Sequence, residues 1–441
     1  MMFKIKWIGL VLCFFFIQPI LFPVSSKAQE PVEFFTLKQT IESVIKENLG
    51  LKSSKEETAA ALAVKKARRT QFFPTLSASY GYNRYDAETV TSGFTAVPKE
   101  EYSFVTSFSQ PIFTGFSLLR QYDIAKLGLD KAKVNEQLTR QNIILDAKNA
   151  YFQLLQTQKL YDIAQKTVVQ IRAQKEVADN FYQVGMTPLN DLLQAQVELA
   201  NAKQELIIAR NNMDNAESNF NTLLRRPINT PVVLKDILTY SPFEENLEYC
   251  LAEAEKNRFE INIADTEVEI AQKELELTKK DYYPSIDLQG NYFKYGTQWD
   301  VDGGQGIYDP SGWNIKAVAK WNFWEWGRTA YGVKEKHSRL SQAQLKKKEI
   351  LDNIQLDVKN AYLRTQEAER AIKTVETAIE QAKENFRINQ ERYKEQISTQ
   401  TDVLIAQTLL SKTMTNYYNA LYAFKISKAT LYRAIGQEVI E

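Results

Sequence analysis

The segment Asp146-Ala-Lys-Asn-Ala-Tyr151 returns as Asp357-Val-Lys-Asn-Ala-Tyr362 at an offset of 211 residues, and this repetition is the most informative feature of the chain. The same offset relates five further positions: Tyr182, Asp191, Leu193, Ala195 and Gln196 return as Tyr393, Asp402, Leu404, Ala406 and Gln407. Because the offset is constant across these matches, the two copies must have the same helix lengths and turn positions. A period this long, against about 20–50 residues for the units of a solenoid, indicates a duplicated subdomain.

The duplication divides the chain of 441 residues into four segments. We predict a signal peptide at residues 1–28, a first repeat at 29–225, a proline-containing linker at 226–244 and a second repeat at 245–441. Each repeat is predicted to contain a helix, two strands and a long helical hairpin.

The first 28 residues resemble a secretory signal. Two early lysines precede an apolar stretch, and Ser26-Lys27-Ala28 supplies a small-residue cleavage site. An uncleaved membrane anchor is the alternative, and Pro19 and Pro23 inside a short apolar run disfavour it. We therefore expect an exported protein.

The remaining chain excludes several classes of function. Cys250 is its only cysteine and His337 its only histidine, which excludes an internal disulfide and most zinc or acid–base sites. Removing the signal takes away three lysines, so the net charge becomes +1 − 3 = −2 and does not favour nucleic acid. The loop at 300–306 resembles a calcium site, but Ser311 stands where an EF-hand needs glutamate. We predict no metal, no cofactor and no enzymatic activity.

Two stretches, 116–184 and 328–395, contain no proline and one glycine each. They are rich in good helix formers, and at about 1.5 Å per residue each makes a rod of roughly 100 Å. Such lengths are typical of coiled coils.

The helix that follows each rod has an apolar seam with uninterrupted 3-4 spacing, which places the seam on one helix face. In the first repeat the seam is Leu192, Ala195, Leu199, Ala202, Leu206, Ala209, Met213, Ala216, Phe220 and Leu223. In the second it is Val403, Ala406, Leu410, Thr413, Tyr417, Ala420, Phe424, Ser427, Leu431 and Ala434. One such seam would suit a dimer interface, whereas two in one chain favour a bundle of antiparallel hairpins.

Residues 75–83, 102–111, 285–292 and 313–323 alternate apolar with polar side chains, which indicates four strands. Residues 87–101 and 297–312 are predicted to be loops. The alternative to membrane strands is a half-buried soluble sandwich. Aromatic residues near the strand ends favour a membrane interface. These residues are Tyr80, Tyr82, Trp313, Trp321 and Phe323.

Trp313 and Trp321 lie eight residues apart, or roughly 26 Å along a strand at about 3.3 Å per residue. For a tilted strand, this spacing approximates the height of the apolar band of an outer-membrane barrel. Four strands are too few to close a barrel, since small membrane barrels begin at about eight. Open edges are not tolerated in lipid, so several chains must share one barrel.

The chain resembles the TolC-like outer-membrane efflux protein family over nearly all of its exported part. The resemblance is carried, in chain order, by Phe73-Pro74, Gln110-Pro-Ile-Phe-Thr-Gly115, Val184-Gly185 with Asp191, Tyr283-Pro284, and Tyr393 with Asp402-Val-Leu404. It implies a mainly α fold with a small β part, in which long coiled-coil hairpins form a periplasmic tunnel. The four strands would be one third of a twelve-stranded outer-membrane β-barrel in a homotrimer. Segments 34–69 and 243–280 would be shorter helices packed along the tunnel.

The resemblance also implies partners and site residues. A periplasmic adaptor would contact the hairpin tips, and an inner-membrane pump would supply energy. Because the turns end long rods, we expect the adaptor to meet Gly185, Met186, Thr187, Ile397 and Ser398. Outer-membrane lipid would surround the barrel.

In relatives, aspartate and tyrosine side chains close the periplasmic end of the tunnel. The matching positions here are Asp191, Tyr393 and Asp402. Ser398 stands where the best-known member has an arginine, and Ile405 where it has a second aspartate, so a closing network of those two groups does not carry over. Like charges gathered on the threefold axis would raise one another's pKa and attract cations. The alternative is that both aspartates only stabilise a helix start.

The sequence thus predicts a passive exit duct of a tripartite efflux or type I secretion system, located in the outer membrane. The competing prediction is a periplasmic coiled-coil adaptor or structural protein without a pore. The cargo is not readable from the sequence.

Overall fold

Long helices carry most of this fold, in a computed structural model that describes residues 34–91, 94–307 and 309–439. The predicted signal at residues 1–28 lies outside the described residues. The helices are α1 (Leu37–Glu47), α2 (Leu49–Thr70), α3 (Ser117–Gln183), α4 (Leu189–Leu223), α5 (Leu247–Asn257), α6 (Phe259–Thr278), α7 (Arg328–Lys394) and α8 (Gln400–Ala434). A 3-10 turn, Lys279–Tyr282, follows α6.

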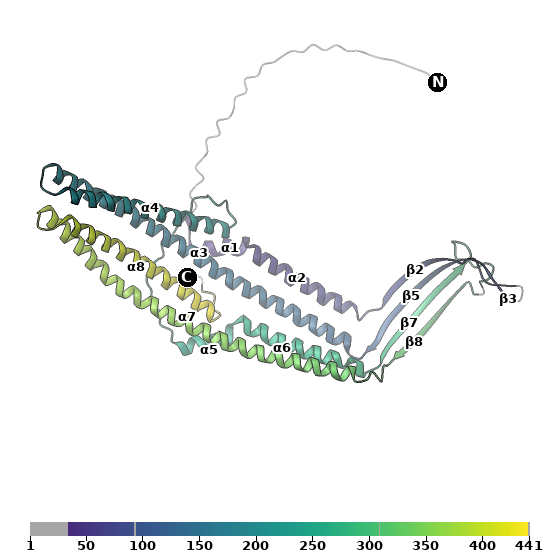
Figure 1. Cartoon of the computed structure of the whole chain (residues 1–441). Coiled ribbons are helices and arrows are strands. Elements are labelled where there is room, and N and C mark those ends of the chain that lie inside the picture. Colours follow the sequence, from purple (N-terminus) through teal and green to yellow (C-terminus); the bar gives the residue numbers. More distant parts are fainter. Residues whose placement is uncertain (1–33, 92–93, 308, 440–441) are drawn as a thin grey trace, which may run out of the picture.

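The two predicted rods are confirmed, because α3 and α7 contain 67 residues each. Each rod pairs with the helix that follows it, so α3 with α4 and α7 with α8 form two hairpins. Figure 1 shows both hairpins ending in tips at one end of an elongated molecule, with the β-sheet at the other. The shorter helices extend this bundle: α2 packs on α3, and α6 lies between α3 and α7.

The predicted seams are also confirmed. Every seam residue of α4 and α8 is buried or half-buried in the single chain. The largest core lies near the middle of the molecule, where the side chains of Tyr151, Phe220 and Phe424 are fully buried. The hydroxyl of Tyr151 donates to the main-chain oxygen of Lys235 over 2.6 Å, which ties the inter-repeat segment to α3.

Four antiparallel strands form the sheet in the order β2-β5-β7-β8. Their bounds are β2 (Thr75–Arg84), β5 (Glu100–Thr114), β7 (Ser285–Gly296) and β8 (Ser311–Lys320). Tyr292 pairs with Trp313, and Ser285 with Lys320. Paired residues share a face, so the register places most aromatic residues on one side, with Tyr292 and Trp313, and most polar residues on the other. Phe293 and Tyr295 near the end of β7 lie on the polar side.

Three sequence predictions need correction. The predicted loop at 87–101 contains a hairpin of β3 (Thr89–Thr91) and β4 (Phe94–Val97), whose β-branched residues favour local pairing. The predicted strand 313–323 ends at Lys320, because its partner β7 begins at Ser285 and offers nothing further to pair with. The predicted loop at 297–312 is shorter, because β8 already begins at Ser311. Within the predicted linker, which stays a prediction, β6 (Val233–Leu234) pairs in parallel with β1 (Phe34–Phe35).

Among the described helices, none has a stretch that is both long enough and apolar enough to cross a membrane.

Candidate functional site at the hairpin tips

The first tip turns through a glycine in the left-handed conformation. Gly185 has a φ of +78°, and its N–H donates to the oxygen of Tyr182 over 3.0 Å. The N–H of Met186 donates to the oxygen of Phe181 over 2.8 Å, which completes a common helix-ending motif. A Cβ on Gly185 would meet no atom within 4 Å, so the backbone conformation alone favours glycine here.

The second tip makes the same turn without a glycine. Gln396, the equivalent of Gly185 in the second repeat, has a φ of +58°. Its N–H donates to the oxygen of Tyr393 over 3.0 Å, and the N–H of Ile397 donates to that of Arg392 over 2.8 Å. The duplication therefore preserves turn geometry even where the residue type that favours it has changed.

The residues predicted to meet an adaptor differ in accessibility. Gly185, Met186 and Ile397 are exposed, whereas Thr187 and Ser398 are half-buried. The Nε2 of Gln396 donates to the Sδ of Met186 over 3.6 Å, so the two tips touch each other. The side chains that the tips offer to a partner are therefore mainly apolar, and exposed Val184 adds to this apolar surface.

Asp402 forms a capping box at the start of α8 with the N-cap residue Thr399. Its Oδ2 accepts from the backbone N–H of Thr399 over 3.0 Å, from the Thr399 hydroxyl over 2.7 Å and from the Ser398 hydroxyl over 3.0 Å. These bonds, led by the one from the Thr399 backbone, lower the pKa of Asp402. Within one chain Asp402 therefore makes the contacts of a helix start, and the rise in pKa expected from like charges on the threefold axis stays a prediction for the trimer.

Tyr393 lies between the hairpins rather than at the surface of one chain. Its side chain is only 3% exposed, and its ring centroid is 5.6 Å from that of Phe181 on the other hairpin. Its hydroxyl is buried and has no hydrogen-bond partner among the described residues. Burial, followed by the nearby charge of Asp191, raises the pKa of Tyr393. The structure thus brings Tyr393 close to half-buried Asp191, whereas exposed Asp402 makes its contacts at its own helix start.

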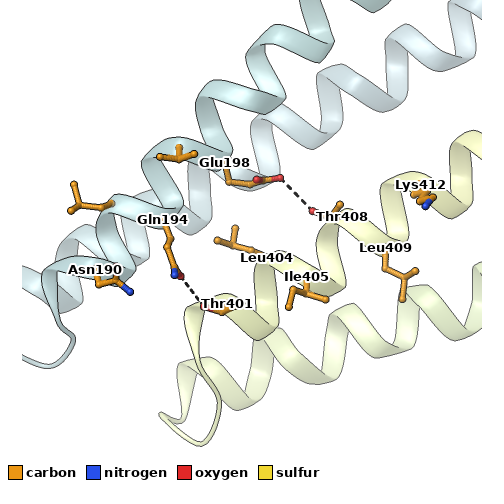
Figure 2. Close-up of a pocket in the computed structure, with 11 residues that line it drawn as sticks. Asn190, Gln194, Glu198, Thr401, Leu404, Ile405, Thr408, Leu409 and Lys412 are labelled. Carbon is orange, nitrogen blue, oxygen red and sulfur yellow. Dashed lines mark hydrogen bonds between the residues drawn. The ribbon is translucent and has the colours of Figure 1, made fainter.

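A groove of about 680 Å³ lies just above the tips, between α4 and α8 (Figure 2). Its walls carry exposed apolar side chains from both helices: Leu193, Val197, Ile405 and Leu409. Two hydrogen bonds cross it. The hydroxyl of Thr401 donates to Gln194 Oε1 over 2.7 Å, and that of Thr408 donates to Glu198 Oε1 over 3.4 Å.

Sequence reasoning missed this groove. The signal was a second apolar stripe with i, i+4 spacing beside each seam, at Leu193 with Val197 and at Ile405 with Leu409. The same view shows Ile405, where the resemblance leads us to expect an aspartate, as part of an apolar wall.

The predicted interface aromatics are all exposed, with Trp313 at 73% and Phe323 at 79%. Tyr80, Tyr82 and Trp313 lie within strands, whereas Trp321 and Phe323 follow β8. The sequence prediction omitted Trp324 and Trp326, which are also exposed on the same connection to α7. Among the described residues, no group of three His, Cys, Asp or Glu side chains is placed to hold a metal ion.

Comparison with known proteins agrees with this geometry. The family model described as outer membrane efflux protein matches residues 40–224 and 250–437. The outer membrane protein TolC of Vibrio cholerae is 21% identical over 364 residues, which cover 82% of this chain and 81% of that protein. TolC of Escherichia coli is 22% identical over 398 residues, which cover 87% of this chain and 78% of that protein. The CmeC outer membrane channel of Campylobacter jejuni shares the fold, with a TM-score of 0.80 at 17% identity over 91% of this chain and 85% of that one.

Paired coiled-coil hairpins joined to a sheet with one aromatic and one polar face define a channel protein that combines a helical tunnel with membrane strands. The chain belongs to the outer membrane efflux protein family. It is an outer-membrane efflux channel with a periplasmic tunnel, and these comparisons do not favour an adaptor without a pore.

Proposed function

We propose that three copies of this chain form one passive exit duct, and that the duct receives cargo through a periplasmic adaptor from an inner-membrane pump. The observation that carries the proposal is the sheet. Among the described strands, β2 and β8 have one neighbour each in the four-stranded sheet, and both faces of β8 are largely exposed. Three chains would pair these edges and give twelve strands, which is enough for a closed barrel.

Family channels work with adaptor proteins and inner-membrane pumps. For this chain we place adaptor contact at the tips, where Met186, Ile397 and Val184 expose apolar side chains at the end of the rods. The pump supplies the energy in this proposal, so the chain itself needs no catalytic group. In this proposal Asp191, Tyr393 and Asp402 lie near the periplasmic end of the tunnel.

The test is the mass of the purified protein in detergent. We expect three chains per particle, recovered from outer-membrane vesicles after a carbonate wash, and ion conductance after insertion into a planar bilayer. A stable monomer with its full strand content would contradict the shared barrel. Release from the vesicles by carbonate would instead favour a periplasmic protein.

A further inference from the structure

A polar cavity of about 270 Å³ lies where the sheet meets the long helices. Ser117 at the start of α3, Lys280 in the 3-10 turn, and Ser285 and Lys320 at the ends of β7 and β8 contribute to its lining. These residues are distant in sequence, and no role has been assigned to them above.

The cavity lies on the polar face of the sheet. Ser285 pairs with Lys320, and the next pair, Ile286 with Ala319, points to the aromatic face. Successive side chains of a strand alternate between the two faces. In a closed barrel the polar face surrounds the lumen, so the cavity opens into the path of the cargo at the junction of barrel and tunnel.

The start of α3 is suited to hold a negative group. The residue before it, Phe116, provides no side-chain cap. Among the first N–H groups of the helix, that of Leu118 donates to the hydroxyl of Thr114 over 3.4 Å. The first N–H groups of a helix carry partial positive charge and bind anions. Gly115, with a φ of +61°, holds this helix start against the 3-10 turn, because a Cβ there would lie 2.5 Å from the main-chain oxygen of Lys280.

Ser117 is the second feature that points to a ligand. The residue is 91% buried, since its exposed fraction is 9%, yet it lines the cavity. Its hydroxyl makes no hydrogen bond to another residue that the structure describes, and it is not fully enclosed, so it is open to the cavity. A polar group in such a place normally has a partner, which here would come from the contents of the cavity.

The charges around the cavity favour an anion. Lys280 and Lys320 form no ion pair within the described part of the chain. Asp281 is the one carboxylate among the described lining residues, so two ammonium groups and a helix start face a single negative charge. Two lysines, a helix start and a buried hydroxyl are a set of donors that suits an oxyanion.

We propose that this cavity binds the phosphate or carboxylate group of an anionic solute as it passes from the tunnel into the barrel. The inference rests on the proposed trimeric duct, because only a closed barrel makes the polar face a lumen. Three such cavities would then form a ring of anion sites at the junction.

The experiment uses the purified full-length protein in detergent and inorganic phosphate as the probe, with binding read from the ³¹P line width. Removing one charged donor should weaken binding about tenfold in Lys320→Gln and in Lys280→Gln. Ser117→Ala should weaken it less. Asp281→Asn should strengthen it, a gain that damage to folding does not produce.

Lys316→Gln is the matched control. Lys316 lies on the same face of β8, four residues before Lys320, and does not line the cavity. We expect its phosphate binding to equal that of the unaltered chain. Equal binding in the unaltered chain and Lys320→Gln, or equal losses in Lys316→Gln and Lys320→Gln, would overturn the site. Mass and conductance report separately on the duct, so a trimeric, conducting protein without phosphate binding would contradict only this inference.

Discussion

At the scale of single residues, the two tips show how much a turn depends on one position. Gly185 and Gln396 have the same left-handed conformation and the same pair of hydrogen bonds. A non-glycine residue there costs roughly 1–2 kcal/mol, and a β-branched one more, because its Cβ crowds the backbone. Gln396 shows that the second tip bears this cost.

Replacing Gly185 with valine should weaken crosslinking to the adaptor and reduce export, because the exposed turn cannot keep its shape. Gly185→Asn is the matched control, since asparagine tolerates the left-handed region and should keep most of both activities. The trimer mass should stay the same in both variants. Full crosslinking by Gly185→Val would show that the shape of this turn does not matter to the partner.

Substitutions of Asp402 can distinguish the role of its charge from its role as a helix cap. Because folding lowers its pKa, the cap contributes stability above the ordinary pKa of aspartate, about 3.9, and loses it as the pH falls through the lowered value. Asp402→Asn keeps an acceptor for the Thr399 N–H but removes the charge, whereas Asp402→Ala removes both. If three Asp402 carboxylates line the pore, both variants should lower cation preference in single-channel recordings.

The helix-start alternative gives a different result. In that case only Asp402→Ala should speed hydrogen exchange at the start of α8, and cation preference should match that of the unaltered protein in both variants. Asp191→Asn provides the comparison from the first repeat, where we expect a smaller change in selectivity. Unchanged selectivity in Asp402→Asn would remove this carboxylate from the pore.

At the scale of elements, the seams and the strand faces follow different periods. The 3-4 seams of α4 and α8 turn toward their hairpin partners, and the adjacent stripe with i, i+4 spacing stays exposed and forms the groove walls. The period-two pattern of β8 separates Ala317 on the aromatic face from Val318 on the polar face. One element can therefore present two surfaces with separate tasks.

The two faces of β8 predict opposite responses to a lysine. Ala317→Lys puts a charge on the face assigned to lipid, which costs about 2–4 kcal/mol near the bilayer midplane and should reduce the yield of membrane-inserted trimer. Val318→Lys is the control: it places the same charge one residue away, opposite Asp287 on the polar face, and should insert normally. The yields of trimer extracted from outer membranes measure both. The reverse order would exchange the assigned faces.

At the scale of the whole molecule, the two repeats contribute neighbouring pairs of strands to one sheet. The sheet order places one repeat's pair of strands, β2 with β5, beside the other's, β7 with β8. This leaves an edge from each repeat, so identical chains can pair edge to edge around a ring. That arrangement allows identical chains to close a ring, and the three chains of the proposed duct would give it twelve strands.

The duplication, the two long rods, the buried seams and the two faces of the strands could be predicted from the residues alone. These are periodic properties of local segments, and geometry along one helix or strand is sufficient to read them. The ends of elements were less certain, since β8 ends at Lys320 only because its partner β7 has no residue left to pair.

Which of these segments meet depends on the packing of the whole chain. Packing buries Tyr393 against Phe181, lets Thr401 donate a hydrogen bond to Gln194 across the groove, and places Lys280 and Ser117 in the lining of one cavity. Each of these pairs is at least 160 positions apart in the sequence. Their proximity depends on how the hairpins and the sheet pack against one another. The polar cavity and the apolar groove were invisible in the sequence for that reason: a local pattern fixes what a surface is made of, and packing fixes what that surface faces.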